Sequence, residues 1–259
     1  MIRTLLLVTG FGTAICLVAL TAAASLAGHK IGTDGIHWTM SEDDGHIGWH
    51  KNTSTAPEPV VTRSLAFGDG DTLVISAPVN VKYVQGNTTS MSATGPKSLT
   101  DRLRLEDGRL FLADGPGAAK TVNFTLGRDG FDVSSDNDDF TVTITAPKVK
   151  HFEVAGTGDL TIAGYDQPSL DMRISGAGHA EVTGRTAALD LDISGMGHAE
   201  LAALMTKDAD VSISGAGDAD IAPTGTATVS VSGTGTVNLK TKPTSLSSNI
   251  SGTGSVNQE

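Results

Sequence analysis

The chain has 259 residues, a formal net charge of −11, 31 glycines, one cysteine and only 4% aromatic residues. The length allows one domain or two, and the abundance of small and β-branched residues favours a narrow β interior. The acidic balance, without any basic cluster, argues against nucleic acid as a partner because a phosphate backbone would be repelled. A lone cysteine excludes an intrachain disulfide.

The N-terminus has the parts of an export signal. Arg3 precedes an uncharged run from Thr4 to His29, and Ser25-Leu26-Ala27 provides small residues for cleavage before Gly28. We expect residues 1–27 to be a signal peptide or, because about 20 apolar residues span a bilayer, a retained anchor. In both cases the rest of the chain is expected to be exported, in the periplasm, at the cell surface or secreted. Membrane contact would occur only through an uncleaved N-terminal segment.

Residues 28–60 are polar and irregular, which predicts a flexible tether. Cleavage before Gly28 would leave 17 basic against 29 acidic residues, a formal charge of −12. The tether carries several metal-ligand types without the fixed spacing of a metal site, so an acidic, His-bearing leader is favoured over a weak metal site. These residues are His29, His37, His46 and His50 with Asp34, Asp43 and Asp44.

Residues 61–150 alternate as strands and are expected to form an irregular β start that caps one end of a larger sheet system. Residues 73–86 follow the pattern of the later repeats, with Ala77-Pro78 in place of a Gly-X-Gly corner. Residues 141–147 do so again. Glu106-Asp107-Gly108 between two alternating runs predicts a hairpin.

Residues 150–256 contain six regular repeats, each with one Gly-X-Gly. The doublets, 18 to 20 residues apart, are Gly156/Gly158, Gly176/Gly178, Gly195/Gly197, Gly215/Gly217, Gly233/Gly235 and Gly252/Gly254. Apolar residues alternate on both sides of each doublet, which indicates two strands per repeat joined at a glycine corner. The sequence therefore predicts an all-β fold, a β-solenoid or parallel β-helix-like stack with coils of about 19 residues, spanning residues 61–256 with the irregular start.

The predicted core consists of four columns, at two and four residues before and four and six residues after the first glycine of each doublet. The column at −2, for example, holds Val154, Ile174, Ile193, Ile213, Val231 and Ile250. The outward position −1 is a column of hydroxyls that could bond along the stack. It holds Ser175, Ser194, Ser214, Ser232 and Ser251.

One outward column places metal-ligand types in four consecutive repeats. We hypothesise that two histidines from this column, with Glu181 or Glu200 beside them, bind a divalent ion or change charge near neutral pH. A solvated polar face is the alternative. The column holds Asp159, His179, His198 and Asp218. No catalytic residue, cofactor-binding residue or other metal ligand is predicted in the repeats.

Calcium-binding, dinucleotide-binding and enzymatic readings fit the sequence less well. A calcium-binding nonapeptide roll needs an Asp two residues after the second glycine, where this chain has Leu160, Ala180 or another apolar residue. The doublets lack the third glycine and the following helix of a dinucleotide site. A non-enzyme is expected; the enzymatic alternative is a polysaccharide-cleaving β-helix, because acidic ladders can supply a catalytic acid and base.

The repeated Ile-Ser-Gly-Ala-Gly-His-Ala-Glu-Val and Ile-Ser-Gly-Ala-Gly-Asp-Ala-Asp-Ile, after Leu-Val-Ile-Ser-Ala-Pro-Val-Asn-Val-Lys-Tyr-Val-Gln-Gly, resemble the bacterial head-GIN family of auto-transporter adhesin heads. The resemblance implies an envelope-associated, solenoid-like domain without established catalytic residues. We expect an exported, non-enzymatic binding or adhesion module that presents a polar repeat surface. A structural envelope module that binds a protein is the alternative.

Partners are expected among carbohydrates or envelope proteins, because outward Ser, Thr, Asn and Asp suit sugar hydroxyls whereas an apolar strip would suit a protein. A homo-oligomer is a further expectation, since the terminal coils of such stacks expose strand edges. The sequence shows no C-terminal membrane barrel after the repeats, so self-translocation is not expected.

Overall fold

The computed structural model describes residues 36–43, 46–51, 58–113, 122–127, 130–135 and 140–259. These belong to two compact units, one formed by residues 1–55 with 119–135 and the other by residues 56–118 with 136–259. The predicted signal peptide or anchor, residues 1–27, lies outside the described residues. Within the described ranges, no helix has the length and apolar character needed to cross a membrane.

The first unit contains a small antiparallel sheet in the order β10-β9-β1-β2. Its strands are β1 (Ile36–Asp43), β2 (His46–Lys51), β9 (Val122–Gly127) and β10 (Gly130–Ser135). The structure thus differs from the expected tether, because two stretches within residues 28–60 are paired strands. Apolar residues at every second position, Ile36, Trp38 and Met40, carried that signal between the polar residues.

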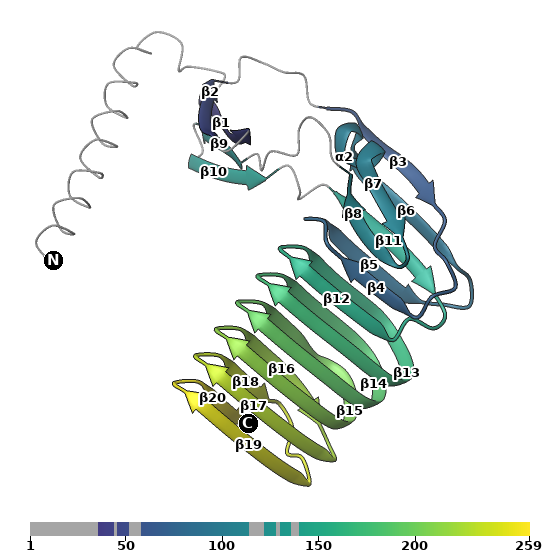
Figure 1. Ribbon diagram of the computed structural model, residues 1–259, viewed down its shortest axis with the longest axis vertical. Coiled ribbons are helices and arrows are strands. Elements are labelled where there is room, and N and C mark those ends of the chain that lie inside the picture. The colour runs from purple at the N-terminus through teal and green to yellow at the C-terminus, as the bar shows by residue number, and fades with distance from the viewer. Residues whose placement is uncertain (1–35, 44–45, 52–57, 114–121, 128–129, 136–139) are drawn as a thin grey trace, which may run out of the picture. The chain divides into compact units, whose positions relative to one another are not determined.

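The second unit is the predicted β-solenoid, with about five turns, and the expected fold class is confirmed. Figure 1 shows its strands stacked from β12 to β20. Three long strands each follow most of one coil: β13 (Asp159–Gly176), β14 (His179–Gly195) and β15 (His198–Gly215). The later coils divide into β16 (Asp218–Pro223), β17 (Thr226–Gly233), β18 (Thr236–Leu239), β19 (Ser245–Gly252) and β20 (Ser255–Gln258).

Each coil contributes to two walls of one continuous parallel sheet. The segments that lead into a Gly-X-Gly corner form what we call the long wall, from β12 (His151–Gly156) through β13, β14, β15 and β17 to β19. The segments that leave the corner form the short wall, ending with β16, β18 and β20. Equivalent repeat residues pair directly, including all six first glycines from Gly156 to Gly252. The six repeats are therefore in register.

The array begins with a coil made of β4 (Thr72–Ile75) and β5 (Asn80–Gln85), in which Ala77-Pro78 occupies the corner. β4 lies between β12 and β8 (Arg109–Leu112), and β5 lies between β13 and β11 (Thr141–Ala146), all in parallel. Residues 73–84 and 141–146 therefore continue the two walls, as their alternation predicted.

Antiparallel strands end both walls at this side of the array. β7 (Leu103–Glu106) pairs with β8 through the predicted hairpin, whose Asp107 and Gly108 both have positive φ. On the other wall, β11 pairs with β6 (Ser90–Pro96), which pairs with β3 (Val60–Leu65). Helix α2 (Lys97–Arg102) contacts β3 and β6 and was not expected from the sequence.

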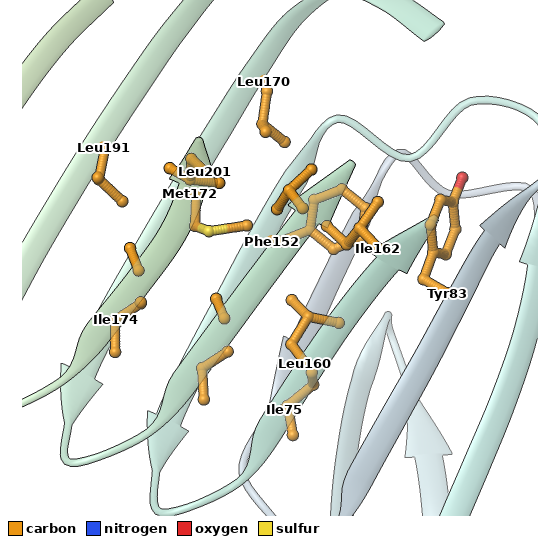
Figure 2. Close-up of a cluster of buried hydrophobic side chains, with 14 of the residues drawn as sticks. Ile75, Tyr83, Phe152, Leu160, Ile162, Leu170, Met172, Ile174, Leu191 and Leu201 are labelled. Carbon is orange, nitrogen blue, oxygen red and sulfur yellow. The ribbon is translucent and has the colours of Figure 1, made fainter. Parts of the chain in front are cut away.

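The core runs between the walls and is built from the predicted columns (Figure 2). Every residue predicted inward at −2 and −4 before the glycine is buried in the first five repeats. The residues at +4 and +6 are buried there as well, including the small Ala180, Ala199 and Ala219. Tyr83, Phe152 and Tyr165 pack at the start of the array, where Phe152 makes edge-to-face contacts with both tyrosines. In the sixth repeat the prediction was wrong for Ile250, which is 42% exposed because no further coil covers it in the structure.

The two glycines of each corner have different roles. The first has a positive φ of +119° to +131° in all six repeats, a backbone region that side chains rarely adopt. The second has no positive φ but faces the preceding coil. A Cβ at Gly178 would lie 2.5 Å from Val154 Cγ1 and 2.8 Å from the carbonyl oxygen of Gly158. Close stacking therefore requires glycine at both positions.

Candidate functional site

The outer face of the long wall changes from charged to neutral along the array. Its outward columns at −5 and −3 begin with charged residues such as Asp171 and Arg173 and end with hydroxyl and amide groups, and the column at −1 is serine from the second repeat onward. We call the neutral part the hydroxyl face. It consists of Ser212, Ser214, Thr228, Ser230, Ser232, Ser247, Asn249 and Ser251, all exposed.

The side chains of the hydroxyl face have no hydrogen-bond partner among the described residues. The serines at −1 were expected to bond to one another along the stack, and within the described part of the chain they do not. Bonds of that kind occur on the short wall, where Asn238 donates to Asp220 at 2.7 Å and Asn257 donates to Asn238 at 3.0 Å. The hydroxyl face therefore presents donors and acceptors, spaced about 4.8 Å across strands and about 6.7 Å along them, to the solvent.

A shallow groove of about 490 Å³ lies on the long wall beside this face. Its floor is the apolar column at −6, formed by Leu170, Leu189 and Ala209, and one side is a row of aspartates in register. The row holds Asp171, Asp190 and Asp210, and His151 closes one end through an ion pair of 3.0 Å with Asp171. The groove was not predicted from the sequence, although an apolar residue directly before an acid recurs in three repeats.

The aspartate row is electrostatically strained. The pKa of Asp190 is raised, first by partial burial and then by the charges of Asp171 and Asp210 on the adjacent strands. Parallel strands hold equivalent side chains about 4.8 Å apart, and like charges at that distance destabilise one another. The groove therefore carries a row of mutually repelling carboxylates along one side.

The metal-ligand column of the short wall is in register as predicted. Asp159, His179, His198 and Asp218 pair in that order on successive strands, and Glu181 pairs with Glu200. The rings of His179 and His198 stack in parallel, with centroids 5.3 Å apart and planes 6° apart. No three His, Asp, Glu or Cys side chains of the described residues converge as a metal cage would require. The structure thus brings His179 and His198 into contact, while Asp159 and Asp218 occupy the adjacent positions of the column without converging on the histidines.

Comparisons with known proteins match this architecture. The family described as "putative auto-transporter adhesin, head GIN domain" matches residues 71–243. A search of curated proteins found no match. Among solved structures, a "putative adhesin" from Bacteroides fragilis NCTC 9343 is 20% identical, with a TM-score of 0.58 over 78% of this chain and 97% of that one.

Two proteins from Parabacteroides distasonis ATCC 8503 are also similar. One, called a "putative adhesin", is 14% identical with a TM-score of 0.49, and the match covers 78% of this chain and 98% of that chain. The other, called a "putative lipid binding protein", is 16% identical with a TM-score of 0.46, over 77% and 96% of the two chains. The family match spans more than half of the sequence and coincides with the solenoid, so the chain belongs to the head GIN domain family.

Proposed function

We propose that this protein is an exported, non-enzymatic adhesion module of the cell envelope and that its hydroxyl face binds carbohydrate. The observation that carries the proposal is the array of eight exposed, uncharged polar side chains without hydrogen-bond partners among the described residues. A binding module agrees with the adhesin names of the family and of the related structure.

Sugar is favoured over protein as the ligand by the chemistry of the surface. Stable protein interfaces have an apolar core surrounded by a polar rim, and the hydroxyl face has no apolar residue at its centre. The most exposed large apolar residues, Met196 and Met205, lie outside it. A glycan chain presents hydroxyls at repeated intervals, so several weak hydrogen bonds can form together across adjacent strands.

The proposal is tested by measuring glycan binding to the purified protein and to a variant that lacks three central hydroxyls. Ser212→Ala, Ser230→Ala and Ser232→Ala combined are expected to weaken binding about tenfold or more, since each hydrogen bond contributes about 0.5–1.5 kcal/mol. The outward positions are exposed, so the fold should be retained. Thr236→Ala with Ser255→Ala, hydroxyls of the short wall, serves as the control. Equal loss in both variants, or no retained glycan, would contradict the proposal.

A non-enzymatic protein is expected to leave polysaccharides uncleaved, which can be tested separately from binding. Incubation with neutral and acidic polysaccharides should produce no new reducing ends, even with glycans that bind. Product formation that is lost in Asp190→Asn or Asp210→Asn would instead support glycoside cleavage by the aspartate row. This measurement separates adhesion from the polysaccharide-cleaving alternative.

A further inference from the structure

His179 and His198 occupy equivalent positions on neighbouring coils of the short wall. Direct strand pairing fixes the two backbones at the spacing of one sheet step, about 4.8 Å, and the rings lie parallel with centroids 5.3 Å apart. Two residues further along the same outward face, Glu181 and Glu200 are paired in the same way. The array thus produces a four-residue patch, His179, His198, Glu181 and Glu200, which we call the His–Glu patch.

None of these four side chains has a hydrogen bond or an ion pair with another described residue, and the two histidine rings stack on each other. The neighbouring positions of the same columns add negative charge, with Asp159 before His179 and Asp218 after His198. No Lys or Arg occupies these two columns in the four coils from Asp159 to Asp220. The patch therefore combines two imidazoles with nearby carboxylates whose field attracts cations.

We propose that the His–Glu patch binds one divalent transition-metal ion of the zinc, nickel and copper class. Imidazole is a preferred ligand for these metals, whereas calcium and magnesium select sites built from oxygen ligands. His179 and His198 provide the two nitrogen ligands. Glu181 or Glu200 provides a carboxylate, and water or a bound molecule fills the remaining position.

Binding requires both rings to rotate. Metal–nitrogen bonds of about 2.0–2.1 Å place two ligating nitrogens about 3.4 Å apart and aimed at one point, whereas the rings now stack within 6° of parallel, so both histidines must change rotamer. Both histidines are half-buried and both glutamates are exposed, so each side chain has a solvent side into which it can rotate. Binding also relieves the repulsion among the acids on this face.

Calorimetric titration of the full, untagged chain with zinc, nickel and copper salts tests the site. His198→Gln and His179→Gln are each expected to weaken binding of one metal equivalent at least tenfold, since even outer-shell changes at metal sites cost 10–100-fold. The matched control is His151→Gln, an exposed histidine on the long wall whose partner is Asp171. Glu181→Gln with Glu200→Gln should weaken the same equivalent by less.

NMR spectra of the imidazole groups locate the bound metal among all histidines of the chain, including those of residues 28–50. Zinc should shift the signals of His179 and His198 at the lowest metal concentrations. Shifts confined to other histidines, or equal weakening in His151→Gln and His198→Gln, would overturn the proposal. Thermal unfolding of each variant without metal should match the parent protein, which separates lost ligands from lost folding.

Discussion

Gly164 and Gly176 both have positive φ angles, but only Gly176 lies against another coil. A Cβ at Gly176 would be 2.6 Å from the carbonyl oxygen of Gly156, whereas a Cβ at Gly164 would meet nothing within 4 Å. We expect Gly176→Ala to destabilise the protein by about 3 kcal/mol or more, because a φ of +126° and a backbone clash combine. Gly164→Ala, at a φ of +68°, should cost about 1 kcal/mol. Urea unfolding measures both, and equal losses would show that the corners can open.

Among single residues, the corner glycines were fully predictable from the sequence, whereas the contact between His179 and His198 was predictable only in its register. A glycine repeated at an interval of 18 to 20 residues has few explanations other than a stacked corner. The register then places His179 beside His198 without further information. Whether the rings stack or point apart depends on side-chain rotamers, which sequence periodicity does not specify.

At the scale of the strand, two aspartates in opposite electrostatic surroundings should respond oppositely to pH. The raised pKa of Asp190 means that its charged form is disfavoured by folding, so its ionisation costs stability above the folded-state pKa. Asp190→Asn should therefore stabilise the protein at pH 7, by about 0.5 kcal/mol as expected for one like-charged cross-strand contact. The gain should disappear as the pH falls below the ordinary pKa of aspartate.

Asp166 is the matched control for Asp190. Arg185 on the next strand donates two hydrogen bonds to its carboxylate, of 2.8 and 2.6 Å, and lowers its pKa. The charged form of Asp166 therefore contributes stability at pH 7 that is lost as the pH falls through the lowered pKa. Asp166→Asn should destabilise at pH 7 and have no effect at the acid end. Thermal melts of both variants from pH 7 downward, with slopes of the same sign, would contradict this assignment.

At the scale of the strand, the inward columns were predictable from the sequence, whereas the groove and the strands β1 and β2 were not. The inward columns of the repeats were predicted because burial on both sides of the glycine follows a period of two. The groove was missed because the inward alternation was followed only to four residues before each first glycine, whereas the apolar residues that line the groove lie at −6. The strands β1 and β2 were not predicted: they pair with each other, but the sheet is completed by β9, which pairs with β1 from about 80 residues further along the chain, and by β10 beside β9.

For the solenoid as a whole, each coil is stabilised by the coils on either side of it, so stability should depend on position in the array. Ile213 and Ile250 occupy the same column two residues before a first glycine, yet Ile213 is 1% exposed and Ile250 is 42% exposed. Ile213→Ala should cost about 2–5 kcal/mol, while Ile250→Ala should cost less than about 1 kcal/mol because less of its surface leaves water on folding.

Hydrogen exchange and urea unfolding together test this gradient. Amides of β14 and β15, paired on both sides, should exchange slowest, and those of β19 and β20 should exchange fastest, because each pairs on one side only among the described strands.

If Ile250→Ala cost as much as Ile213→Ala, Ile250 would have to be covered in solution. Sedimentation at several concentrations would then show whether a second copy of the chain covers it, since unpaired parallel edges and exposed Leu246 and Ile250 form a surface on which another coil could stack. A monomer with equal losses would contradict the nearest-neighbour description of the array.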